Sequence, residues 1–231
     1  MLIDAHCHIY STADDVTTLC NSVTSADWER IPDSPGIIPF YGIHPWYAKS
    51  CSKIELMSLG QFIKEKKEAG IKFGIGETGL DKTGRNPDIE DQKGFFAFHL
   101  WLAEQYKVPV AVHCVHAWGP LLEILSEVPD DLPVLMHSYS GSIETAKILL
   151  KRNTFFSFSP EVRNVGKHLE VLRQLPLERI FLETDLSQYP GDDSYRDFFE
   201  SFYGYVCSVR RIQPPELKKI VENNLKTLFA P

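Results

Sequence analysis

The sequence has none of the features that mark a membrane or secreted protein. No apolar run approaches the roughly 18–20 residues of a membrane span, and the chain does not open on a basic stretch followed by an apolar one, as a signal peptide does. Internal repeats and low-complexity linkers are also missing. We therefore expect residues 1–231 to form one domain that has no membrane contact.

Cysteines are few, and their spacing shows no pairing. The five cysteines are Cys7, Cys20, Cys51, Cys114 and Cys207. An odd number without a framework indicates free thiols in a reducing compartment, so we expect a cytoplasmic protein. Cys7 and Cys114 stand next to histidines, but we expect both to pack in the core.

Positive charge is also in short supply. The chain has 24 lysines and arginines against 31 aspartates and glutamates, a net charge of −7. A protein that grips long nucleic acid usually shows a basic face. If the substrate is a phosphodiester, bound cations have to neutralise it locally. This balance favours DNA ends, short single strands or small phosphates over an extended duplex. No obligate protein partner is inferred from the sequence.

Short apolar stretches separated by amphipathic ones fill the rest of the chain. The predicted strands cover residues 3–9, 16–23, 37–43, 72–76, 108–112, 132–136, 154–158 and 179–184. The predicted helices cover residues 25–30, 53–70, 88–107, a segment opened by Pro120, and residues 142–152, 165–175, 194–209 and 215–229. Ser25 is the expected N-cap of the first helix, and Ile54, Met57, Phe62 and Ile63 are the expected inner face of the second.

Eight apolar strands that alternate mostly with helices predict a parallel sheet of the α/β class. Eight such units close most economically into a (β/α)8 TIM barrel. The first two units are short, so we expect the barrel to be slightly reduced there. An open doubly wound sheet is the alternative, but no glycine-rich nucleotide turn follows any predicted strand.

The first strand carries two histidines. His6 and His8 project from the same face of an extended chain, about 6–7 Å apart, and Asp4 joins that face. Imidazole nitrogen suits zinc, iron, nickel and manganese, so the pair predicts a metal site. On this segment alone, the alternative is a buried strand whose histidines are hydrogen-bonded core residues.

Further polar residues follow the ends of other predicted strands. They are Glu77, His113, His137 and Asp185, which end the fourth, fifth, sixth and eighth strands. Active sites of barrels lie at the carboxyl ends of the strands, and the eighth strand lies beside the first in a closed barrel. We therefore expect Asp185 beside His6 and His8, with Glu77, His113 and His137 as a second group.

Four histidines and two carboxylates exceed the ligand set of a single catalytic metal. The pattern predicts two divalent cations with Glu77 as the bridge, and it does not distinguish Mg, Mn, Zn, Ni and Fe. Two cations about 3.5–4 Å apart can clamp the attacking and leaving oxygens of a phosphoryl transfer. Glu77 and Asp185 are the predicted catalytic carboxylates, with Asp185 able to take the proton from the attacking water.

Six motifs then follow one another along the whole chain. They are Asp4-Ala5-His6-Cys7-His8, Gly42-Ile43-His44-Pro45-Trp46, Gly76-Glu77-Thr78-Gly79-Leu80-Asp81, Pro109-Val110-Ala111-Val112-His113, His137-Ser138-Tyr139-Ser140-Gly141-Ser142 and Leu182-Glu183-Thr184-Asp185. In this order they resemble the signatures of the TatD family of metal-dependent hydrolases.

The resemblance implies a barrel of the amidohydrolase superfamily that holds two, or three, divalent cations. It implies 3′-directed exonuclease action on DNA or a related phosphodiesterase activity. His6, His8, Glu77 and Asp185 would hold one cation, and Glu77, His113 and His137 the other. The resemblance also implies that His44 lies near the substrate phosphate; a residue that shapes the loop before Pro45 is the alternative.

The chain departs from the family pattern where substrate contacts are expected. The segment from His8 to His44 is short, and Leu186-Ser187 replaces the usual Ala-Pro. The family's arginine after the fifth-strand histidine is absent, and His116, mostly neutral at pH 7, replaces its charge only weakly. We count His116 with His44 as a candidate substrate-binding residue.

These observations favour a TatD-type deoxyribonuclease. A metal-dependent hydrolase of small amides, esters or phosphoesters is the alternative, because the surface is acidic and the arginine is missing. A scaffold protein with a structural metal is the third reading. Asp81 and Arg85 follow the fourth strand and could position substrate, but solvated loop charges are the preferred interpretation. His99 and His168 are interpreted as helix residues without an assigned role.

Overall fold

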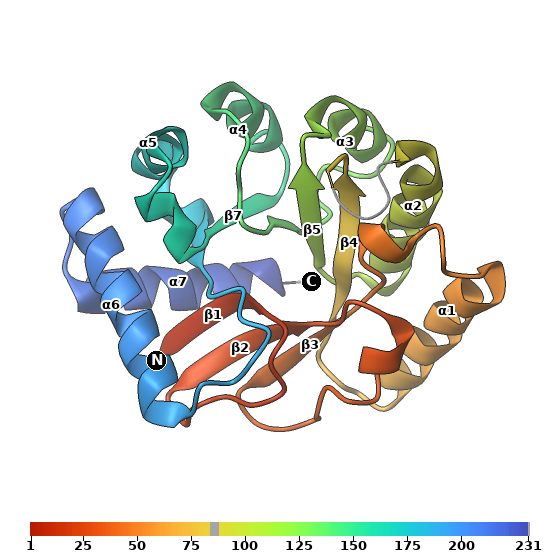
Figure 1. Cartoon of the computed structure of the whole chain (residues 1–231), viewed down its shortest axis with the longest axis horizontal. Helices are drawn as coiled ribbons and strands as arrows, with labels where there is room; N and C mark the ends of the chain where they lie inside the picture. The colour runs from red at the N-terminus through yellow and green to blue at the C-terminus, as the bar shows by residue number, and fades with distance from the viewer. Residues whose placement is uncertain (84–87, 231) are drawn as a thin grey trace.

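The chain forms one sheet of eight parallel strands, whose order in space follows the order in the sequence. The computed structural model describes residues 1–83 and 88–230. The strands are β1 (Leu2–Cys7), β2 (Val16–Asn21), β3 (Ile37–Tyr41), β4 (Gly74–Asp81), β5 (Val110–Val115), β6 (Val134–Met136), β7 (Thr154–Phe158) and β8 (Ile180–Leu182). The sheet curls on itself, and an arc of helices surrounds it except on the side of β2 and β3 (Figure 1).

The barrel closes through the residues that follow β1 and β8. The Asp185 N–H donates to the carbonyl of His6 at 3.0 Å, and the His8 N–H donates to the carbonyl of Leu186 at 2.8 Å. The two ends of the chain therefore meet beside the N-terminal histidine pair. The predicted (β/α)8 barrel is confirmed, and the doubly wound alternative is wrong.

The helices are unevenly distributed around the sheet. They are α1 (Lys53–Glu68), α2 (Ile89–Tyr106), α3 (Trp118–Leu125), α4 (Ile143–Leu149), α5 (Gly166–Gln174), α6 (Asp192–Arg210) and α7 (Pro214–Leu228), with 3-10 turns η1 (Ser25–Asp27), η2 (Pro45–Tyr47), η3 (Pro160–Arg163) and η4 (Leu177–Arg179). Residues 1–41, all of them described, contain only η1 outside the first three strands. The reduction of the first two units is therefore confirmed.

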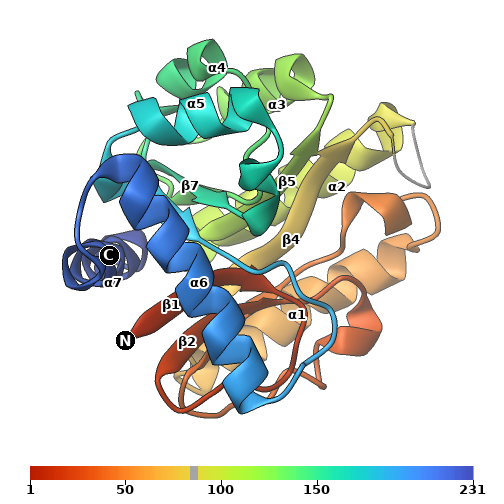
Figure 2. The same ribbon diagram turned by 60° about the vertical axis from the view of Figure 1, so that its left-hand side comes forward.

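The C-terminal helices cover the side of the barrel that this reduction leaves open. α6 and α7 lie beside β1 (Figures 1 and 2). The buried hydroxyl of Tyr203 in α6 accepts from the N–H of Ile3 at 3.3 Å and donates to its carbonyl at 3.1 Å. Asn224 in α7 donates to the carbonyls of Leu177 and Ile180 at 2.8 and 2.7 Å, which ties α7 to the start of β8.

Side chains cap the starts of α1, α2 and α4, whereas, within the described part of the chain, α3, α5, α6 and α7 have no side-chain cap. At the predicted helix start of residue 142, the hydroxyl of Ser142 accepts the N–H of Thr145 at 3.1 Å. The expected cap at Ser25 is wrong: Thr24 is the cap of η1. The carboxylate of Asp27 accepts hydrogen bonds from the N–H groups of Val23 and Thr24 at 3.1 and 2.9 Å. These bonds to residues that precede η1 stabilise the start of the turn.

The expected inner face of α1 is half wrong. Phe62 and Ile63 are buried, whereas Ile54 and Met57 are 77% and 72% exposed. At about 3.6 residues per turn, both exposed residues lie on the side of α1 opposite to the buried Leu59. The inner face begins instead at Leu56, which packs against the core, so the spacing predicted the helix but not which of its sides faces inward.

β4 and β5 extend beyond their predicted ends, to Asp81 and Val115. Their pairing shifts register between Ile75 and Thr78, a bulge that places an extra residue in the wall beside the site. Gly79 has φ +136, and a side chain there would overlap the carbonyl oxygen of His113. Only glycine allows β4 and β5 to approach this closely and carry Glu77 and His113 side by side.

The length and polarity of the helices decide whether any of them could cross a membrane. Within residues 1–83 and 88–230, every helix is too short or too polar to cross a bilayer.

Candidate metal centre and active site

Glu77 lies at the centre of a polar cluster at the carboxyl ends of the strands. Its side chain is 2% exposed, and its oxygens face different histidines. Oε2 lies 3.3 Å from Nε2 of both His6 and His8. Oε1 lies 2.9 Å from Nδ1 of His113 and 3.0 Å from Nε2 of His137. The carboxylate therefore stands between the two predicted histidine groups.

Asp185 completes the first group. Its Oδ1 lies 3.6 Å from Nε2 of His8 and 3.9 Å from Nε2 of His6. The side chain is 41% exposed, so Asp185 faces solvent while Glu77 is enclosed. All six predicted metal-binding residues are brought together at one rim, although they come from five separate segments of the chain.

Hydrogen bonds behind the histidines determine which ring nitrogen is free. Nδ1 of His8 lies 2.9 Å from the carbonyl of Asn21, so it carries the proton and leaves Nε2 as a ligand atom. Nε2 of His113 lies 3.1 Å from Oδ2 of Asp81, so its Nδ1 is the free atom. Such partners orient metal-binding histidines in proteins. In both rings the free nitrogen is the one that faces Glu77.

His44 differs from the other histidines. Its Nδ1 accepts the N–H of Trp46 at 3.2 Å, while its Nε2 lies 3.3 Å from Oε1 of Glu77. A neutral ring whose Nδ1 is an acceptor carries its proton on Nε2. His44 is therefore built to donate a hydrogen bond into the site rather than to bind a cation. Its predicted place beside the reacting groups agrees with this geometry.

The carboxylate of Glu77 is held in its charged form. Burial would raise the pKa of Glu77, but His44, His137 and His6 keep it well below its usual range. Burial acts to lower the pKa of His8, yet Glu77 and Asp185 raise it to about 9. The pKa of His137 is also raised despite burial, chiefly by Glu77. The site therefore attracts positive charge, and protons and cations compete for the same nitrogens.

The donor set fits divalent cations. Ligand atoms of His6, His8 and Glu77 lie within 4.8 Å of one another, and Nδ1 of His113 and Nε2 of His137 lie 2.9 and 3.0 Å from the other oxygen of Glu77. Among the described residues, no lysine or arginine lies within ion-pair distance of Glu77. A buried carboxylate needs a compensating charge, and mixed imidazole and carboxylate ligands suit catalytic divalent metals.

Three buried acids support the cluster, and the sequence patterns did not single out their roles. Asp81 is only 1% exposed and binds His113 and Trp46, so its interpretation as a solvated loop charge is wrong; Arg85 lies outside the described residues. Glu77 and Asp81 are four residues apart on one strand, and continuing the alternation past Glu77 would have found Asp81.

The other two acids are Glu183, next to His6 and His137, and Asp4, in β1. Glu183 Oε1 is 3.4 Å from Nδ1 of His137. Asp4 is fully buried and accepts from the N–H and hydroxyl of Thr184 at 2.9 and 2.6 Å and from Tyr195 at 2.6 Å. Asp4 therefore holds β8 against β1 beneath the cluster rather than joining it.

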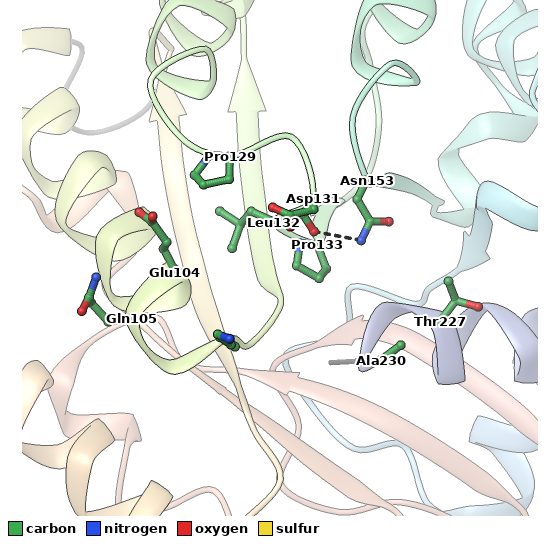
Figure 3. A pocket seen from close by; sticks show the side chains of 10 residues that line it. Glu104, Gln105, Pro129, Asp131, Leu132, Pro133, Asn153, Thr227 and Ala230 are labelled. Carbon is green, nitrogen blue, oxygen red and sulfur yellow. Dashed lines mark hydrogen bonds between the residues drawn. The ribbon is translucent and has the colours of Figure 1, made fainter.

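Two cavities lie at opposite ends of the barrel. The larger, about 630 Å³, is at the amino ends of the strands and is lined by Glu104, Asp131 and Asn153 among others (Figure 3). It contains no histidine. The other, about 510 Å³, opens over His113, His137 and Asp185. This cavity gives a substrate access to the polar cluster.

His116 lies at the wall of the second cavity. It is exposed, has a left-handed φ of 54°, and comes directly after β5. The structure therefore places His116 near the predicted centre, and its contact with substrate stays a prediction. Cys7 and Cys114 are buried, as expected for core residues.

A comparison with known families decides the identity of this barrel. The family described as TatD related DNase matches residues 3–230. The chain belongs to that family. The resemblance read from the six motifs is thereby confirmed, and this TatD protein is a hydrolase.

Known relatives agree with this assignment. The mouse putative deoxyribonuclease TATDN3 is 25% identical over 260 residues, covering 99% of this chain and 88% of the mouse protein. The human 3′-5′ RNA nuclease TATDN2 is 30% identical over 178 residues, covering 74% of this chain but only 23% of the human protein.

A bacterial relative links the sequence to a solved structure. The uncharacterized metal-dependent hydrolase YjjV of Escherichia coli is 28% identical over 197 residues, covering 81% of this chain and 74% of that protein. Its crystal structure superposes on this chain with a TM-score of 0.84 at 23% identity, covering 100% of this chain and 98% of the other. The structural match confirms the fold.

Proposed function

We propose that this TatD protein is a metal-dependent nuclease that removes nucleotides from the 3′ ends of DNA. One observation carries the proposal: the two oxygens of Glu77 each face a separate group of histidines beneath an open cavity. That arrangement suits a carboxylate that bridges two cations. The names of the mouse and human relatives favour nucleic acid as the substrate.

The proposed ligands divide between two positions. His6, His8 and Asp185 would hold one cation, His113 and His137 the other, and Glu77 would contact both. When bound, divalent cations supply Lewis acidity to the phosphoryl group and lower the pKa of attacking water. Mg, Mn, Zn, Ni and Fe all remain compatible with these ligands.

The protein's own groups would orient the substrate and move the proton. The Nε2–H of His44 points at the oxygen of Glu77, where it can donate to a phosphate oxygen that carries negative charge. Asp185 lines the cavity and is half exposed, so it can accept the proton of the attacking water. The buried partners Asp81 and Glu183 keep the rings of His113 and His137 in place.

We further propose that residues 1–231 act as one catalytic unit in the cytoplasm. Five unpaired cysteines, of which four are buried, support a reducing compartment.

The test uses labelled single-stranded DNA and purified protein loaded with Mg²⁺ or Mn²⁺. We expect stepwise shortening from the 3′ end by the wild type and none by Glu77→Ala. Glu68→Ala, which removes an exposed glutamate of α1, serves as the matched control and should behave as wild type. No cleavage by wild type, or full cleavage by Glu77→Ala, contradicts the proposal.

A small-molecule hydrolase is the second candidate. The acidic balance of the chain and the absence of an arginine next to His113 favour it. A panel of small phosphodiesters, esters and amides separates the two candidates. Turnover of a small substrate with no action on DNA or RNA would establish the second and exclude the first.

A further inference from the structure

The cavity over the metal centre continues outward between two helices. The inner cavity of about 510 Å³ is lined by His113, His137 and Asp185. An outer cavity of about 290 Å³ lies against α4 and α5, which stand side by side at the rim (Figures 1 and 2). Four residues line both cavities: Ser140, Gly141, Ser142 and Lys167. The two cavities therefore form one groove, which leads from the polar cluster past Lys167.

Lys167 is the cation of this groove. Among the described residues that line the two cavities, it is the only lysine or arginine. It is exposed, and no ion pair to it occurs among the described residues. Glu144, Glu161 and Glu170 also line the groove. The walls as a whole are therefore not basic, and Lys167 is their single fixed positive charge.

The remaining lining suits a nucleotide. The half-buried indole of Trp118 lines the inner cavity and meets Tyr139 edge to face, with ring centroids 5.0 Å apart. Aromatic faces next to a cation are the usual surface for single-stranded nucleic acid. The outer cavity is close to the lower bound of small-ligand sites, about 300 Å³, so it has room for on the order of one nucleotide.

We propose that Lys167 binds a backbone phosphate of the single strand that leads into the active site, and that the strand runs in the groove between α4 and α5. The inference rests on the proposed nuclease function and adds to it the path of the strand and its positioning residue. Lys167 touches no reacting atom. Its loss therefore weakens binding of the strand and leaves the chemical step in place.

Salt dependence gives the decisive readout. A protein that neutralises a phosphate releases counterions, and each contact adds about 0.7 to the slope of log affinity against log salt for single strands. An exposed ion pair changes affinity by up to about fivefold. If substitution of Lys167 changed only the local structure, the slope of log affinity against log salt would not fall by the amount expected for one phosphate contact.

The experiment compares wild type with Lys167→Gln, Lys167→Arg and Lys147→Gln on 3′ shortening of oligothymidylate with Mn²⁺ at several salt concentrations. Lys147 is an exposed lysine of α4 outside the groove lining, so its loss changes the net charge equally. We expect Lys167→Gln to raise KM about three- to fivefold with kcat nearly unchanged, and to lower the salt slope by about 0.7. Lys167→Arg and Lys147→Gln should match wild type.

Two failures are distinguishable. If wild type shortens the strand but Lys167→Gln keeps its KM and salt slope, or shifts them no more than Lys147→Gln does, the strand path is overturned and the nuclease function stands. If wild type does not act on the oligonucleotide at all, the proposed function and the inference fall together.

Discussion

Replacing Asp81 with asparagine tests whether the carboxylate behind His113 prepares that ring to bind a cation. Oδ2 of Asp81 accepts from Nε2 of His113 at 3.1 Å and from Nε1 of Trp46 at 2.6 Å. Oδ1 accepts from the N–H and hydroxyl of Thr83 at 2.6 and 2.8 Å. Burial would raise the pKa of Asp81, but His113 and Thr83 keep it well below its usual range, so the group is charged at neutral pH.

Asparagine has the same shape but only one accepting oxygen. In one orientation its NH2 group faces the donors of His113 and Trp46; in the other it faces the N–H of Thr83. A buried donor left without an acceptor costs about 1–3 kcal/mol, and His113 can avoid that cost by moving its proton to Nδ1. That nitrogen is the one that faces Glu77, so the proton would block the ligand atom.

Loss of the partner behind a metal-binding histidine typically costs 10–100-fold in metal affinity or activity. We therefore expect Asp81→Asn to weaken binding of at least one Mn²⁺ by this factor, about 1.4–2.7 kcal/mol, and to lower kcat on DNA by a similar factor. Isothermal titration calorimetry measures the first effect and oligonucleotide cleavage the second. Asp197→Asn removes an exposed charge from α6 and serves as the control. An Asp81→Asn protein with wild-type metal affinity and turnover would refute the reasoning.

Three further results are expected. His44→Gln should keep the wild-type metal stoichiometry but lose about 10²–10³-fold in kcat, the usual effect of removing one donor to a charged oxygen; loss of a cation on calorimetry would instead make His44 a ligand. Burial lowers the pKa of His99 to about 4 against an ordinary 6.5, so the unfolded chain takes up the proton first as pH falls. The free energy of unfolding therefore keeps its full value above pH 6.5 and falls as the pH drops toward 4, by about 2 kcal/mol between pH 7 and 5. Urea unfolding of His99→Gln should show a smaller fall in the free energy of unfolding over this interval. Saturating Mn²⁺, at about 100 times Kd, should stabilise the protein by about 2.7 kcal/mol for each bound cation, a Tm rise of roughly 5–10 °C per cation that a chelator reverses and Glu77→Ala lacks.

Local patterns were sufficient for the barrel and for the residues at its mouth. Alternation along a strand is a short-range property, and a buried parallel strand is an apolar run, so β7 was predicted at its observed bounds of Thr154–Phe158. Polar residues that follow such runs have to lie at one end of a parallel barrel. His6, Glu77 and His137 could therefore be assigned to one rim before any distance was known.

Other features required the folded chain, because they depend on what closure brings together. Two side chains that bind Asp81, those of His113 and Trp46, come from two other segments of the chain, whereas the end of the apolar run suggested a loop at Asp81. The hydrogen bond from Trp46 determines which nitrogen of His44 carries the proton. Lys167 reaches the groove only because α5 packs beside α4. Sequence periodicity specifies the direction of a side chain from its own strand or helix, but the partner it meets there comes from another segment, and only the closed barrel determines which one.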